Sequence, residues 1–363
     1  MKLRLPTWLG APRLDPVLLV LLVLIIGTGL MVLYSASGQD MAMVKRQAIR
    51  LGFGVVVMLV ISQVPPLTLR RWTPWLYGIG IILLMATLGV GVGRGTQRWL
   101  DVGLVRFQPS ELMKLAVPMM VAWYLHPRVL PPSWKMIAVT LGLLLIPTLL
   151  IYRQPDLGTA LLVAASGMFT LYLAGLRWRV LLGFAGLAAA AAPLLWLVLK
   201  EYQRNRVRTF LDPEADPLGH GWNIIQSKIA VGSGGLSGKG WLNGTQSNLE
   251  FIPERHTDFI LAVFAEEFGL LGVLVLMVLY LLLIARGLYI ASIARDTWSR
   301  LLAGALSLTL FVYVMVNGGM VSGVLPVVGV PLPLISYGGT SAVTLLAGFG
   351  MMMSIYSHRK FIS

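Results

Sequence analysis

Ten long apolar segments constrain the fold of this chain more than any other feature of its sequence. A helix needs about 20 mostly apolar residues to cross the roughly 30 Å hydrocarbon core of a membrane. Segments near this standard occupy residues 17–35, 48–64, 74–93, 110–125, 136–152, 157–176, 180–199, 258–285, 301–319 and 338–356. Their apolar residues are continuous instead of alternating, which argues against a membrane β-barrel. The sequence therefore predicts an all-α integral membrane protein, a polytopic bundle of about ten transmembrane helices.

Composition supports a single membrane domain over residues 1–363. Hydrophobic residues make up 57% of the chain and charged residues only 12%, against about 25% charged residues in soluble domains. We expect residues 200–257, which mix glycine, proline and charge, to form one large extracytoplasmic loop within this domain. No cleavable signal peptide is apparent, and the absence of cysteine excludes thiolate chemistry and disulfides.

The distribution of basic residues predicts the orientation. If both termini lie in the cytoplasm, that side of the membrane holds 14 basic and two acidic residues, and every short loop there carries at least a basic pair. This pattern follows the positive-inside rule, so the net charge of +14 reflects topology and not nucleic-acid binding. We expect a multi-pass membrane protein, in contact with membrane lipids and without a nucleic-acid partner.

A charged run at the mouth of one apolar segment marks a candidate site. Residues 250–258 read EFIPERHTD and contain five titratable side chains, those of Glu250, Glu254, Arg255, His256 and Asp258. Ionisable groups are costly beside lipid, so such a cluster is by default a functional site. The adjoining apolar run of residues 268–285 spans about 27 Å, which predicts that Glu266 and Glu267 lie near the outer interface. If the helix continues, Asp258 stands about 12 Å further out, within reach of a lipid substrate's head group.

A second charged pair lies at the start of another apolar segment. Residues 108–114 read QPSELMK, in which Pro109 and Ser110 are typical of a helix start. Glu111 and Lys114 are three residues apart, so both side chains face the same side of the helix. The following apolar run is too short to span alone, which places both charges within membrane depth. They form either a buried ion pair that orders the bundle or the lining of a polar cavity.

Four further features bear on the site, and the first two are ambiguous. Outer-face cations suit a phosphate or diphosphate ligand, or anionic lipid head groups; they include Arg46 and Arg98. Trp99 is either a residue of the interfacial aromatic belt or a ligand contact. The glycine-rich residues 232–240 fail as a phosphate-binding Walker A motif, because Gly240 follows Lys239 where Ser or Thr is required, and we interpret them as a flexible or tightly turned loop. Residues 326–341 are too rich in proline and glycine for an unbroken helix and predict an irregular element facing the same outer cavity.

Three of these motifs together resemble those of the SEDS proteins of shape, elongation, division and sporulation. They are PERHTDF at residues 253–259 followed by AEEFG at 265–269, QPSELMK at 108–114, and PLPLISYGGTS at 331–341. They occur in the family's order and are spread over most of the chain. Arg255, residues 239–247 and residues 327–330 resemble the RodA elongation branch more than the FtsW division branch.

The resemblance implies a peptidoglycan glycosyltransferase that polymerises lipid II on the outer face of the cytoplasmic membrane. It makes Asp258 the catalytic residue and a class B penicillin-binding protein the partner. It also implies assistance by a divalent cation, Mg²⁺ or Mn²⁺, with no organic cofactor.

The residues suit this reaction. Asp258 is our candidate general base for the acceptor hydroxyl, and the candidate substrate-binding residues are Arg46, Arg98, Trp99, Glu111, Lys114, Arg255 and His256. Two other functions remain open, a lipid II flippase and a scaffold that activates a penicillin-binding protein. A flippase should carry polar groups through the whole membrane depth, whereas here they gather in the outer half. In a scaffold, Asp258 would be dispensable for chemistry.

Overall fold

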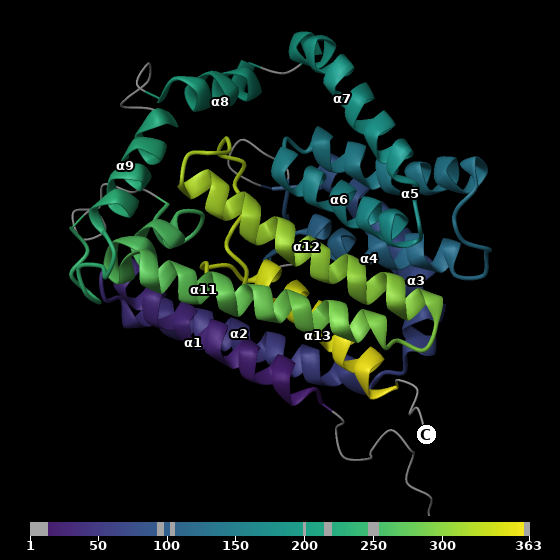
Figure 1. Cartoon of the computed structure of the whole chain (residues 1–363), viewed down its shortest axis with the longest axis horizontal. Coiled ribbons are helices and arrows are strands. Elements are labelled where there is room, and N and C mark those ends of the chain that lie inside the picture. The colour runs from purple at the N-terminus through teal and green to yellow at the C-terminus, as the bar shows by residue number, and fades with distance from the viewer. Residues whose placement is uncertain are drawn as a thin grey trace, which may run out of the picture.

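The computed structural model describes residues 14–92, 98–101, 106–198, 201–213, 220–245 and 254–358, which form a helical bundle (Figure 1). Glu250, at the start of the charged run, lies outside the described residues. Each of the ten predicted segments coincides with a helix, which confirms the predicted fold class. These helices are α1 (Pro16–Ala36), α2 (Met41–Gln63), α3 (Pro66–Val90), α4 (Pro109–Leu125), α5 (Trp134–Arg153), α6 (Leu157–Leu173), α7 (Trp178–Val198), α11 (Ile260–Ser292), α12 (Thr297–Val321) and α13 (Thr340–Ser357).

Six of these helices, α1, α3, α5, α11, α12 and α13, are long and apolar enough to cross a membrane. Helix α6 and the first part of α7 are apolar but shorter. Helix α2 is long but carries three cations in its first ten residues, and α4 has 17 residues that include a charged pair. The helices that deviate most from a plain membrane span are thus those with charged residues near their N-terminal ends.

Acidic residues set where several helices begin. Asp15, Asp40, Asp156 and Asp296 are the N-cap residues of α1, α2, α6 and α12, and each carboxylate accepts hydrogen bonds from first-turn N–H groups. A carboxylate at this position satisfies unpaired donors and interacts favourably with the helix dipole. Helix α4 begins at Pro109, as the sequence predicted.

Helix α4 occupies the centre of the bundle. It packs against α3, α5, α6, α12 and α13, and most of its residues are buried, including both of its charged ones. Helix α12 also contacts α6 and α11, while α2 runs alongside α13. The charged pair of α4 and residues such as Tyr313 and Asn317 of α12 therefore lie inside the protein.

The predicted outer loop contains two helices, α8 (Glu201–Leu211) and α9 (His220–Ser233). In Figure 1, α8 and α9 form an arch that leads from the end of α7 back to α11. A two-stranded hairpin, β1 (Leu100–Asp101) and β2 (Arg106–Phe107), precedes α4.

Helix α11 is kinked where the glycine-rich loop docks on it. Gly269 has φ 64° and ψ −167°, a backbone conformation open almost only to glycine. The N–H groups of Leu270 and Leu271 bond instead to the carbonyls of Gly235 and Leu236, at 2.9 and 3.1 Å. The loop is therefore tightly turned, and it satisfies main-chain groups that the kink releases.

Candidate active site

Residues 254–259 form a turn that precedes α11 and carries Asp258. Because α11 begins at Ile260, the expectation that the helix continues outward through Asp258 is wrong. Asn317 of α12 fixes the turn: its Nδ2 donates hydrogen bonds to the main-chain carbonyls of Asp258 at 2.9 Å and Val330 at 2.8 Å. Asn317 is fully buried, so both bonds are shielded from water. This contact positions Asp258 through its main chain and not through its carboxylate.

A second anchor comes from the irregular segment between α12 and α13. Ser336 Oγ donates to the carbonyl of Thr257 at 2.6 Å, and the N–H of Tyr337 donates to the carbonyl of His256 at 2.9 Å. The rings of His256 and Tyr337 meet edge to face, with their centroids 6.2 Å apart. Residues 322–339 are non-helical, as the sequence predicted, and residues 332–336 are buried.

The carboxylate of Asp258 lies beside Gly329 of the same segment. The side chain is half-buried, and its Oδ2 is 3.6 Å from the position that a Cβ on Gly329 would occupy. Gly329 has a φ of +73°, which favours glycine and lets the main chain approach the carboxylate closely. Asp258 is thus held at a partly accessible position just ahead of α11.

The two arginines predicted near this turn have different surroundings. Arg255 shares the turn with Asp258, and its Nη2 lies 3.9 Å from the position that a Cβ on Gly38, between α1 and α2, would occupy. Arg46 forms an ion pair with Asp40 at 3.6 Å, and both side chains are about half exposed. The structure thus places Arg255 and His256 in the same turn as Asp258, while Arg46 pairs near the start of its own helix.

A buried charged pair lies on α4. Lys114 Nζ contacts Glu111 Oε1 at 2.7 Å, and the two residues are 6% and 4% exposed, which confirms that they form a buried pair within the bundle. Lys114 also lies over the ring of Tyr313 from α12, 5.2 Å from the ring centroid. A cation and an anion this deep require each other, because removing one leaves the other uncompensated.

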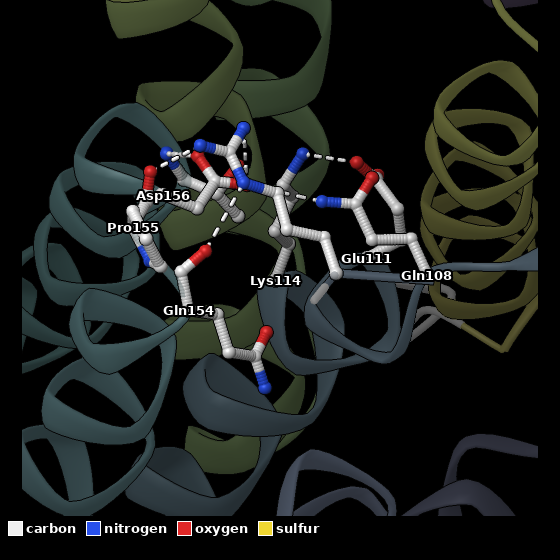
Figure 2. Close-up of polar contacts among 8 residues, drawn as sticks. Gln108, Glu111, Lys114, Gln154, Pro155 and Asp156 are labelled. Carbon is white, nitrogen blue, oxygen red and sulfur yellow. Dashed lines mark hydrogen bonds and ion pairs between the residues drawn. The ribbon is translucent and has the colours of Figure 1, made fainter. Parts of the chain in front are cut away.

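The turn between α5 and α6 extends this polar cluster (Figure 2). Asp156 accepts a hydrogen bond from Gln108 Nε2 at 3.1 Å and lies 3.7 Å from the Arg98 guanidinium. Arg98 also donates to the main-chain carbonyls of Gln154, at 3.2 Å, and Pro155. Asp156 therefore connects Arg98 to Gln108, the residue that immediately precedes α4.

Trp99 occupies the extended strand ahead of the hairpin. Its main chain pairs with Val92 through two hydrogen bonds, of 2.8 and 3.2 Å, and its side chain is half-buried. This pairing connects the end of α3 to the segment that carries Arg98.

One face of α12 connects the two groups of residues. Tyr313 and Asn317 are four residues apart, so they lie on the same side of the helix about one turn from each other. Tyr313 contacts the charged pair of α4, and Asn317 holds the turn of Asp258. A cavity of about 40 Å³ adjoins Tyr313 on this face, lined by polar groups of Glu111 and Lys114 at one end and by apolar residues of α12 and α13. Glu111 Oε2 has no hydrogen-bond partner among the described residues.

Glu266 and Glu267 lie at the kink of α11 and are buried. Glu266 Oε1 accepts from Lys239 Nζ at 2.7 Å and from the N–H of Thr245 at 2.8 Å, which ties the glycine-rich loop to α11. Glu267 accepts from the hydroxyl of Ser35 on α1. The pair therefore joins α1, α11 and the glycine-rich loop, a role that the sequence had left open.

Sequence reasoning missed Asn317, Ser336 and Asp156. Asn317 interrupts an apolar run, which is the usual signal of a polar group at membrane depth, whereas Asp156 stands between two predicted spans, where an acidic residue is ordinary. Ser336 gave no such signal, because a serine in a proline- and glycine-rich segment is ordinary.

Comparisons with known proteins agree with one another. A family model described as cell cycle protein, for FtsW, RodA and SpoVE, matches residues 16–361. The peptidoglycan glycosyltransferase MrdB of Escherichia coli K12 is 57% identical over 353 residues, covering 97% of this chain and 95% of that protein. The rod shape determining protein RodA of Thermus thermophilus matches with a TM-score of 0.73 at 32% identity, covering 98% of this chain and 99% of that one. A chain from a peptidoglycan synthase complex, in a structure concerned with coordinating polymerization and crosslinking, matches with a TM-score of 0.84 at 34% identity, covering 95% of this chain and 98% of that one.

Proposed function

This chain belongs to the cell cycle protein family of FtsW, RodA and SpoVE, and from that premise we propose that it is a peptidoglycan glycosyltransferase. It polymerises lipid II into glycan strands for cell elongation and rod shape. The observation that carries this proposal is the turn of Asp258, fixed by Asn317 and Ser336 at the outer end of a membrane bundle. Such a position gives a carboxylate access to the head group of a lipid whose tail remains in the bilayer.

Asp258 acts as the general base of an inverting transfer. The acceptor sugar hydroxyl attacks the anomeric carbon of the donor, a new C–O glycosidic bond forms, and the bond from that carbon to the lipid diphosphate breaks. The hydroxyl proton passes to the Asp258 carboxylate, and the electron pair of the broken bond leaves with the diphosphate. Anchoring the turn through main-chain carbonyls of Thr257 and Asp258 keeps the carboxylate in position without neutralising its charge.

Cationic side chains offset the charge that develops on the leaving diphosphate. Arg255 stands three residues from Asp258 in the same turn. Arg98 and Lys114 belong to the cluster at the outer end of α4, which α12 connects to the turn. Arg46, His256, Trp99 and Glu111 complete the set of substrate-binding residues that we propose.

A divalent cation fits this site only in combination with substrate. The described residues contain no group of three His, Asp or Glu side chains placed to hold a metal. Mg²⁺ is commonly bound through one or two carboxylates together with substrate phosphates, and Asp258 is the carboxylate that meets this requirement. A bound cation would supply charge stabilisation to the diphosphate.

The setting that we propose is the inner membrane, with both termini in the cytoplasm and the turn of Asp258 facing outward. The basic residues of the short loops support this orientation. We also propose a class B penicillin-binding protein as the partner. Support comes from the similarity to a chain of a peptidoglycan synthase complex.

The test is glycan polymerisation from purified lipid II by the chain and its penicillin-binding partner. The variants are Asp258→Asn and, as a matched control, Glu201→Gln, which makes the same carboxylate-to-amide change on exposed α8. We expect polymer from the wild-type chain and from Glu201→Gln, and none from Asp258→Asn with an unchanged melting temperature. The partner alone must make no polymer.

Two outcomes would contradict this proposal. Equal polymer from wild type and Asp258→Asn would remove Asp258 as the base and favour a scaffold. No polymer from the wild-type chain, combined with transfer of lipid II between leaflets of proteoliposomes, would favour a flippase.

A further inference from the structure

Arg50 of α2 is half-buried and lies on the helix face that packs toward α13. It is three residues from Gln47 and four from Gly54, so the three share one helix face. Gln47 is 1% exposed, and a Cβ on Gly54 would lie 2.6 Å from a methyl carbon of Leu346 in α13. Arg50 therefore points toward the beginning of α13 together with residues that pack there.

The Arg50 guanidinium stacks on Tyr337. Its Cζ lies 4.8 Å from the ring centroid, and its Cδ lies 3.4 Å from the position that a Cβ on Gly339 would occupy. Stacking uses the face of the guanidinium and leaves the five in-plane N–H donors to be satisfied at its edge. Among the described residues no carboxylate lies within 4.0 Å of Arg50, whereas Arg46 and Arg98 each have one.

Tyr337 connects this arginine to the turn of Asp258. The N–H of Tyr337 donates to the carbonyl of His256 at 2.9 Å, and the His256 ring meets the Tyr337 ring edge to face. His256 is two residues from Asp258, which limits their Cα separation to about 7.6 Å. The side-chain amide of Gln47 donates to the carbonyl of Ser336 and accepts from the N–H of Gly338, at 3.3 Å each. These bonds hold α2 against the segment that contains Tyr337.

A half-buried guanidinium with a stacked face and no carboxylate neighbour has the form of an anion-binding group. It also lies beside the start of α13, whose N-cap Gly339 makes no side-chain cap, so the helix dipole there has the same sign as the guanidinium. The ligand that this geometry suits is a phosphate group carried by a lipid at the outer interface.

We propose that Arg50 is a further substrate-binding residue, which donates hydrogen bonds to the diphosphate of a polyprenyl-linked saccharide bound at the turn of Asp258. This inference rests on the proposed function. Phospholipid head groups offer the same phosphate chemistry, and the two sources are separated by experiment.

The test compares Arg50→Gln and Arg50→Lys with wild type, each with its partner in nanodiscs of phosphatidylcholine. Lys45→Gln is the matched control, because it removes an exposed cation from the same helix. We expect Arg50→Gln to raise the KM for lipid II about tenfold with little change in kcat, the size of one charge-assisted hydrogen bond. Arg50→Lys keeps the charge but loses the planar fork and should raise KM less. Lys45→Gln should behave as wild type.

A binding arm separates this inference from the proposed function. Undecaprenyl diphosphate is titrated into the Asp258→Asn protein with and without Arg50→Gln, and the Kd should rise by the same factor as the KM. If wild type makes no polymer but Arg50→Gln still weakens binding, the proposed activity fails and the diphosphate site stands. An unchanged KM and Kd would refute the site.

Two other results would also overturn it. A lower kcat at constant Kd would mean that Arg50 only positions the turn through Tyr337. An effect that appears only when phosphatidylglycerol is added to the nanodiscs would assign Arg50 to phospholipid head groups. Melting temperatures accompany every variant, and where Arg50→Gln melts early, Arg50→Lys decides by the same criteria.

Discussion

Replacing Asn317 should uncouple Asp258 from the bundle. Asn317 Nδ2 donates to the carbonyls of Asp258 and Val330, and the residue is fully buried. Asn317→Leu has a similar volume but no donor, so both carbonyls lose their partner. Each such loss costs about 1–2 kcal/mol inside a membrane protein. The docked arrangement of the turn is therefore weakened by about 2–4 kcal/mol.

This free energy converts into a loss of activity. Since about 1.4 kcal/mol corresponds to a factor of ten, the equilibrium between the docked and undocked turn shifts by about 30- to 1,000-fold. We expect kcat for lipid II polymerisation to fall at least tenfold. Asn317→Asp should be at least as harmful, because an ionised carboxylate cannot donate to either carbonyl.

The assay measures initial polymerisation rates together with the melting temperature of each variant. The control is Ser354→Ala. Like Asn317→Leu it removes a side-chain donor from a main-chain carbonyl, because the Ser354 hydroxyl of α13 donates to the carbonyl of Val64, but this bond lies away from the turn. Both variants should melt earlier, whereas only Asn317→Leu should lose activity at a temperature where each remains folded. Wild-type kcat in Asn317→Leu would refute the role of this residue in holding Asp258.

Three further predictions concern other parts of the fold. Gly269→Ala places a Cβ 2.3 Å from a main-chain nitrogen and adds about 1–3 kcal/mol of backbone strain, so it should lower the melting temperature, whereas Gly232→Ala, which meets nothing within 4 Å, should not. Lys114→Met leaves Glu111 buried alone and should cost about 3–5 kcal/mol; the double variant Lys114→Met with Glu111→Leu should recover most of that stability, and polymerisation assays of it would show whether the pair has only a structural role. Burial, and secondly the neighbouring Arg70 guanidinium, lower the pKa of His126 below its usual 6.5. As the pH falls through 6.5, the imidazole is therefore protonated in the unfolded chain before it is protonated in the folded protein, which favours unfolding. The melting temperature should therefore drop between pH 7.5 and 5.5 by less in His126→Gln than in wild type, and identical pH profiles would contradict this.

The helices were predictable because their signals are local. Continuous apolar runs marked all ten spans, and Pro109 with the spacing from Glu111 to Lys114 located the start of α4 and its ion pair. The irregular segment between α12 and α13 followed from its proline and glycine content. In each case the physical cause acts within a few residues of the chain, where periodicity and turn chemistry apply.

The anchors of the turn could not be read in this way. Asn317 is 59 residues from Asp258, and Ser336 is 79 residues from Thr257. Their partners are main-chain carbonyls, which every residue has, so the sequence does not mark them. The kink at Gly269 is a similar case, because the carbonyls that bind the N–H groups of Leu270 and Leu271 are main-chain groups of the glycine-rich loop. The expectation that α11 continues through Asp258 failed because hydropathy does not distinguish a helical residue from a bonded turn.

Tyr313 and Asn317 lie on one face of α12, so this helix contacts both the charged pair of α4 and the turn of Asp258. A displacement of α12 would move Tyr313, which contacts Lys114, together with Asn317, which anchors Asp258. The position of the proposed base relative to the buried charges is therefore fixed by this helix. Glu111, one of whose carboxylate oxygens is unpaired among the described residues, lines the cavity on the same face. Leaving buried polar atoms unpaired is costly, and a purely structural bundle would gain stability by replacing them with apolar groups. A ligand group that donates a hydrogen bond to Glu111 Oε2 would remove this cost, so we propose that this face of α12 belongs to the reaction site and not only to its support.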